Sequence, residues 1–130
     1  MNTLNDRKYT KSDEWVKLDG NLATIGVSDY AQDALSDVVF FEAVVSAGDT
    51  ISANHQIATL ESVKAAADVN SPVTGKISAI NDALASSPEL VNTDPYGQAW
   101  MVKIEVDNPA ELDNLMDAAA YDAYCAVRSH

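Results

Sequence analysis

The sequence predicts a mainly β protein, a small barrel or sandwich with short helices and a helical C-terminus. Short β-branched and aromatic runs recur through the first two-thirds of the chain, and turn signals separate them. Helical spacing replaces this pattern at the end of the chain. At 130 residues, the chain is long enough to bury a core, and we expect one domain over residues 1–130.

The N-terminal part predicts a hairpin followed by a short helix and a long strand. Residues 14–18 and 22–27 have strand composition and flank a tight turn. Ser28 can cap a helix over residues 29–35, because its hydroxyl can accept from a free backbone N–H. The β-branched and aromatic run at residues 37–45 predicts a strand buried on both faces or nearly so.

The middle of the chain predicts a second hairpin with a lysine at its tip. Residues 55–63 form a strand pattern, and residues 67–70 can return antiparallel to it. Lys64 lies between the two. A strong turn signal at residues 71–75 then precedes a further strand at residues 76–81.

The last third predicts one half-buried strand and two helices. In residues 100–106, Trp100 and three further apolar residues occupy every second position, so one face of this strand is expected to be buried. Asn108 before a proline marks a helix start. Asp117 can cap a last helix, which would place three residues on one face: Tyr121, Tyr124 and Cys125.

Charge and composition limit the classes of partner. The formal net charge is −12, which repels nucleic acid and suits docking onto basic protein surfaces, although charge alone favours a purely solubilising role. No apolar run is long enough for a membrane span, and the first residues lack signal-peptide features, so we expect a cytoplasmic protein. Cys125 is the only cysteine, and with His55 and His130 it forms no metal-ligand spacing.

Lys64 is the most informative single residue. No lysine or arginine occurs from residue 18 to residue 63, whereas Glu61 and Asp68 lie close in sequence. These acids favour the ammonium form, which argues against a lysine that acts as a base or Schiff-base nucleophile. The residues alone leave two interpretations open: an ordinary solvated lysine, or a lysine presented for modification.

A family resemblance favours modification. Residues 61–75, with Glu-Ser-Val-Lys-Ala, then Asp68, then Ser-Pro-Val-Thr-Gly, resemble the lipoylation site of glycine cleavage H proteins. Further blocks in the family's order lie at residues 8–16, 25–32 and 88–100, so the resemblance covers nearly the whole chain. It implies a lipoyl-type hybrid of barrel and sandwich with added helices, in which lipoate is joined to Lys64.

The implied role is that of a non-catalytic carrier in glycine catabolism and one-carbon metabolism. In the family, a pyridoxal-phosphate glycine decarboxylase (P protein) loads an aminomethyl group onto the lipoyl arm. An aminomethyltransferase (T protein) removes it, and dihydrolipoamide dehydrogenase (L protein) reoxidises the arm. The resemblance also implies a lipoate-attaching enzyme as a partner.

Three acids acquire roles from the same resemblance. It places Glu61 in recognition by the lipoate-attaching enzyme, Glu14 as an acceptor for the aminomethyl ammonium, and Asp68 in the same cleft. From the residues alone, each has an ordinary alternative: a solvated strand acid, a surface acid and a turn-stabilising acid, respectively.

Other functions stay open or are disfavoured by the residues present. A lipoyl domain of a 2-oxoacid dehydrogenase complex usually shows Asp-Lys-Ala and linkers, and a biotin carrier has methionines around its lysine. A relative that donates lipoate to other proteins remains an alternative. An enzyme using Lys64 or Cys125 directly would lack a base and an orienting partner. The chain departs from the family at Asp13, at Ser36 and at residues 43–45.

Overall fold

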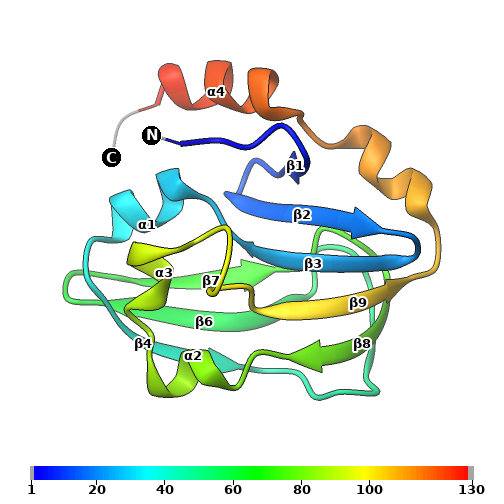
Figure 1. Cartoon of the computed structure of the whole chain (residues 1–130), viewed down its shortest axis with the longest axis horizontal. Coiled ribbons are helices and arrows are strands. Elements are labelled where there is room, and N and C mark those ends of the chain that lie inside the picture. The colour runs from blue at the N-terminus through cyan, green and yellow to red at the C-terminus, as the bar shows by residue number, and fades with distance from the viewer. Residues whose placement is uncertain (1, 129–130) are drawn as a thin grey trace.

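The protein, described by a computed structural model over residues 2–128, consists of two antiparallel sheets with short helices around them (Figure 1). The larger sheet has the strand order β1 (Lys8–Tyr9), β2 (Glu14–Asp19), β3 (Leu22–Val27), β9 (Val102–Val106), β8 (Gly75–Ile80) and β5 (Thr50–Ile51). The smaller sheet has the order β4 (Val38–Ala43), β6 (Gln56–Ser62) and β7 (Ala66–Asn70). The predicted mainly β barrel-sandwich hybrid is confirmed.

The helices are α1 (Asp29–Leu35), α2 (Ala83–Ser86), α3 (Leu90–Thr93), the 3-10 helix η1 (Pro109–Asn114) and α4 (Ala118–Ala126). Three of the five helices in the described residues begin at capping residues that the sequence indicates, whereas α2 and α3 were not predicted and have no side-chain cap. Side chains of Ser28, Asn108 and Asp117 each accept a hydrogen bond from the backbone of the helix that follows. Within residues 2–128, none of these helices has the length and apolar character to span a membrane.

The main core lies between the two sheets. Inward-facing residues of both sheets are fully buried there, including Ile25, Ile57, Leu60, Ile77 and Ile104. Their removal from water is the main favourable contribution to folding. The smaller sheet is thereby held against the larger one, which fixes the position of the β6–β7 hairpin.

A second, aromatic cluster attaches α4 to the larger sheet. Tyr9 and Tyr121 stack with ring centroids 4.6 Å apart, and Trp15 and Tyr30 are buried beside them. In Figure 1, α4 runs across β1 and the start of β2 at one end of the molecule. Trp15 and Tyr30 therefore belong to this second part of the core.

The expectation that β4 is buried on both faces is wrong. Val39 and Phe40 are 56% and 40% exposed, while only Val38 and Phe41 are buried. β4 is the edge strand of the smaller sheet, and its register with β6 shifts between Val38 and Phe40. This bulge places two neighbouring side chains on the outer face, so an apolar run does not become a doubly buried strand.

The half-buried strand near the C-terminus is confirmed from Val102 onward. Val102, Ile104 and Val106 are buried in alternation with more exposed residues. The prediction that Trp100 shares this face and Met101 opposes it is wrong, because β9 begins only at Val102. Met101 is fully buried and donates its backbone N–H to the Ile25 carbonyl at 2.7 Å.

Candidate functional site

Lys64 lies at the tip of the β6–β7 hairpin, as the sequence predicts. Glu61 pairs with Ala66 across the hairpin, and the connecting residues between the strands are exposed. The turn between β6 and β7 projects from one end of the molecule (Figure 1). Within residues 2–128, no hydrogen bond, ion pair or ring contact involves the Lys64 side chain. Its amine is therefore open to approach from solvent.

Ser62 shapes the tip, a role that the sequence analysis did not assign. Its hydroxyl accepts from the backbone N–H of Lys64 at 3.3 Å and of Ala65 at 3.1 Å. Its own N–H donates to the Ala65 carbonyl at 2.7 Å, which closes the turn. Serine is known to form such turns through its hydroxyl, so its position two residues before the lysine was an available signal.

Glu61 and Asp68 share the outer face of the smaller sheet. Leu60 points into the core, so the alternation of β6 turns Glu61 and Thr59 outward, and Asp68 pairs with Thr59. Both carboxylates are exposed, and Asp68 accepts from the Gln56 amide at 3.1 Å. The structure thus brings these two predicted site residues onto one face, beside the hairpin tip.

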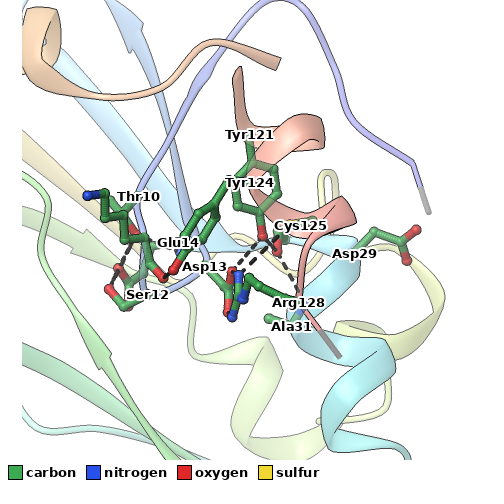
Figure 2. Close-up of polar contacts among 12 residues, drawn as sticks. Thr10, Ser12, Asp13, Glu14, Asp29, Ala31, Tyr121, Tyr124, Cys125 and Arg128 are labelled. Atoms are coloured by element: carbon green, nitrogen blue, oxygen red, sulfur yellow. Dashed lines mark hydrogen bonds and ion pairs between the residues drawn. The ribbon is translucent and has the colours of Figure 1, made fainter. Parts of the chain in front are cut away.

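Glu14 is a buried carboxylate with a hydrogen bond at each oxygen, and Figure 2 shows it beside Thr10 and Ser12. It is 2% exposed and accepts from the hydroxyls of Thr10 at 2.6 Å and Ser12 at 2.7 Å. Its second oxygen accepts from the Asn70 N–H at 3.2 Å. Burial raises the pKa of Glu14 above its ordinary value, and the hydrogen bonds that it accepts oppose this rise. Neither hydroxyl partner was predicted from the sequence.

Glu14 lies at the far end of the hairpin from Lys64. Asn70 ends β7, whereas Ala66 begins it beside the tip. Four residues of strand separate these ends by about 13 Å. The structure therefore does not bring the side chains of Glu14 and Lys64 together, and a role for Glu14 towards a group on Lys64 requires a long arm that reaches along the hairpin.

Asp13, one of the departures from the family pattern, faces helix α4. The Arg128 guanidinium forks onto its carboxylate at 2.7 and 2.9 Å, and the Tyr121 hydroxyl donates to the same carboxylate at 2.8 Å (Figure 2). Arg128 also lies 4.4 and 4.6 Å from the ring centroids of Tyr30 and Tyr124. The hydrogen bond to Asp13 raises the pKa of Arg128.

The arrangement presents a primary amine that is open to acylation. Lys64 and the residues on either side of it, Val63 and Ala65, are exposed. Cys125 is buried in α4, and among residues 2–128 no cluster of three or more potential ligands could hold a metal ion. A solvent-facing primary amine on a defined turn can form an amide with a carboxyl group.

The chain is similar to known proteins along nearly its whole length. The family model described as "Glycine cleavage H-protein" matches residues 7–128. The glycine cleavage system H protein of Symbiobacterium thermophilum is 50% identical over 92% of each chain, and H protein 2, mitochondrial, of Arabidopsis thaliana is 47% identical over 94% of this chain and 78% of the relative.

A solved structure supports the same assignment. The H protein of Mycobacterium marinum aligns with a TM-score of 0.82 at 28% identity, over 95% of this chain and 97% of that one. The family model covers far more than half of the chain, and the blocks on which the resemblance rested lie within or beside the matched range. This chain belongs to the glycine cleavage H-protein family.

Proposed function

We propose that this chain is the lipoyl-bearing carrier of the glycine cleavage system and has no catalytic activity of its own. The observation that supports this proposal most directly is the Lys64 amine. It is exposed at a hairpin tip and has no partner within the described residues 2–128. When bound there, lipoate supplies a dithiolane that accepts and releases a one-carbon unit. Family membership supports this role over that of a 2-oxoacid dehydrogenase lipoyl domain.

The chain's own contribution is presentation. The two-sheet core holds the hairpin, so the tether on Lys64 starts from a fixed point and samples a limited volume. A tethered group reaches a docked partner's active site at high effective concentration, so each transfer becomes nearly intramolecular.

The acids around the hairpin supply recognition in this proposal. Glu61 lies three residues from Lys64 and contacts the lipoate-attaching enzyme. Asp68 on the same face lines the path of the arm. Glu14, at the far end of β7, holds the aminomethyl ammonium, because its second oxygen accepts a hydrogen bond from the Asn70 N–H and can accept another.

The partners in the proposal are the pyridoxal-phosphate glycine decarboxylase, the aminomethyltransferase, dihydrolipoamide dehydrogenase and a lipoate-attaching enzyme. Each must reach the same lysine, and its exposure at the tip supports sequential docking. A cytoplasmic location stays a prediction, which the unpaired thiol of Cys125 supports because reducing compartments keep thiols free.

Intact mass tests the attachment site. The unmodified protein is incubated with a lipoate ligase, ATP and lipoic acid, and it should gain one lipoyl group. Lys64→Arg should gain none, while Lys76→Arg, at an exposed lysine on β8, should gain one as the wild type does. Lipoylation of Lys64→Arg, or a wild-type protein that a competent ligase leaves unmodified, would overturn the proposal.

A second assay separates a carrier from a lipoate donor. The lipoylated protein is added to the P, T and L proteins with glycine, and glycine-dependent CO2 release is followed. A carrier restores turnover at catalytic amounts. Absence of turnover together with transfer of lipoate to another acceptor protein would favour the donor alternative.

A further inference from the structure

We propose that Ser62 is a positioning residue for the modification of Lys64: its hydroxyl holds the hairpin tip in the shape that the lipoate-attaching enzyme binds. The inference rests on the proposed function of Lys64. It adds a residue that does not react itself and that acts through the backbone of the lysine.

One hydroxyl makes all the side-chain hydrogen bonds within the tip. Ser62 Oγ accepts from the N–H groups of Lys64 and Ala65 and donates to the Ala65 carbonyl at 3.2 Å. A serine hydroxyl has one proton and two lone pairs, so these contacts use its full capacity. Ser62 Oγ is therefore not available to take a proton from the Lys64 amine, and its role is structural.

Among residues 2–128, no other side chain fixes the backbone of Lys64 in the way that the Ser62 hydroxyl does. Val63 is 67% exposed, so apolar packing does not fix the turn. The Val63 N–H donates to the Asp37 carbonyl at 3.0 Å, which ties down the residue before the lysine but not the lysine. No glycine or proline occurs between Ser62 and Ala66 to restrict or favour a turn.

This arrangement predicts a particular kinetic effect. An enzyme that binds one tip conformation binds less tightly as the population of that conformation falls, because the apparent dissociation constant scales inversely with the competent fraction. The amine itself is unchanged once the tip is bound. Loss of the hydroxyl should therefore raise KM and leave kcat unchanged.

The experiment measures steady-state lipoylation of the unmodified protein by a lipoate ligase. Ser62→Ala removes all three of the hydroxyl's contacts and should raise the KM for the carrier at least two- to tenfold, since roughly that range corresponds to losing one hydrogen bond of ordinary strength, with kcat preserved. Ser62→Thr keeps the hydroxyl and should remain near wild type. Ser78→Ala, at an exposed serine on β8, is the matched control and should change neither constant.

A second readout separates positioning from direct contact with the enzyme. Backbone order parameters of Lys64 and Ala65 should fall in Ser62→Ala and recover in Ser62→Thr, while the rest of the amide spectrum reports an intact fold. An unchanged KM, a lowered kcat, or a raised KM with an equally ordered tip would each overturn the inference. Failure of the proposed function differs, because the wild type itself would then stay unmodified.

Discussion

Ser36 holds its backbone in a conformation that normally requires glycine. It follows α1 with φ 66° and ψ −150°, where any side chain is strained by about 1–3 kcal/mol. Ser36→Gly should relieve this strain, partly offset by the greater freedom of glycine in the unfolded chain. We expect a net stabilisation of about 1 kcal/mol, measured by urea unfolding.

Ser87 provides the control for this prediction. It also follows a short helix, α2, but its φ is −137°, which any residue adopts. Ser87→Gly should therefore lower the free energy of unfolding by about 0.5–1 kcal/mol, because glycine only adds entropy to the unfolded state. Equal effects of the two substitutions would show that Ser36 is not strained.

The buried carboxylate of Glu14 should make stability depend on pH. Since burial raises its folded pKa above the ordinary 4.5, the folded state binds this proton more tightly than the unfolded chain. The stability that the protonated Glu14 contributes to the folded state is present below pH 4.5 and is lost as the pH rises through the folded pKa of Glu14. Glu14→Gln should remove this loss, because the amide can accept from the Asn70 N–H and donate to the two hydroxyls.

Urea unfolding between pH 4 and pH 7 measures the effect. The free energy of unfolding of Glu14→Gln minus that of the wild type should increase as the pH rises across this window. Parallel curves would mean that folding does not shift the proton affinity of Glu14. The effect should appear in the unmodified protein, so it is independent of any lipoyl arm.

At the scale of elements, adjacent phenylalanines on β4 test the bulge directly. Phe41 is 4% exposed in the main core, whereas Phe40 is 40% exposed on the outer face. Phe41→Ala should cost about 3–5 kcal/mol, and Phe40→Ala about 1 kcal/mol or less, judged by urea midpoints. Comparable losses of stability in the two variants would mean that both side chains are buried, as the sequence alone predicts.

The sequence could not predict this bulge, because register is set across strands. The composition of β4 correctly predicts a strand, but which side chains face outward depends on where Val38 and Phe40 pair with β6. The hairpin around Lys64 was predictable because both strands and the turn are contiguous in sequence. Likewise, the starts of α1, η1 and α4 were predictable because a capping side chain acts within its own first turn.

The C-terminal helix depends on contacts that sequence reasoning did not find. Asp13 and Arg128 are 115 residues apart, and no local pattern links them. Arg128→Met keeps much of the apolar length but loses the forked bond, and it should cost about 1–2 kcal/mol of stability. Amide exchange in α4 should accelerate more than exchange in β6, since the loss is local.

A double-mutant cycle isolates the pair. Arg128→Met and Asp13→Asn are measured singly and together by urea unfolding. The coupling energy should be about 1 kcal/mol, because the partly buried fork is lost in each single variant. Additive effects would show that Arg128 stabilises α4 through the rings of Tyr30 and Tyr124 instead.

At the scale of the whole molecule, the two-sheet architecture was predictable and its long-range polar contacts were not. Strand number, turns and patterning indicate a barrel or sandwich because each follows from local chemistry. Glu14 accepts a hydrogen bond from the backbone of Asn70, 56 residues away, so its sequence neighbours gave no sign of this contact. The exposure of Lys64 could be predicted because it follows from the local turn. The distance between Lys64 and Glu14 could not, because it depends on how two segments far apart in sequence pack together.

The net charge of −12 gives a final prediction about encounter with partners. If acidic charge steers docking, lipoylation should slow as added salt shortens the screening length from about 10 Å at 0.1 M towards about 3 Å at 1 M. Glu61→Gln, beside the tip, should lower kcat/KM and reduce this salt dependence more than Glu105→Gln, on an exposed position of β9. Both variants change the net charge equally, so equal effects would mean that the charge acts only through the overall field and that Glu61 is an ordinary solvated acid.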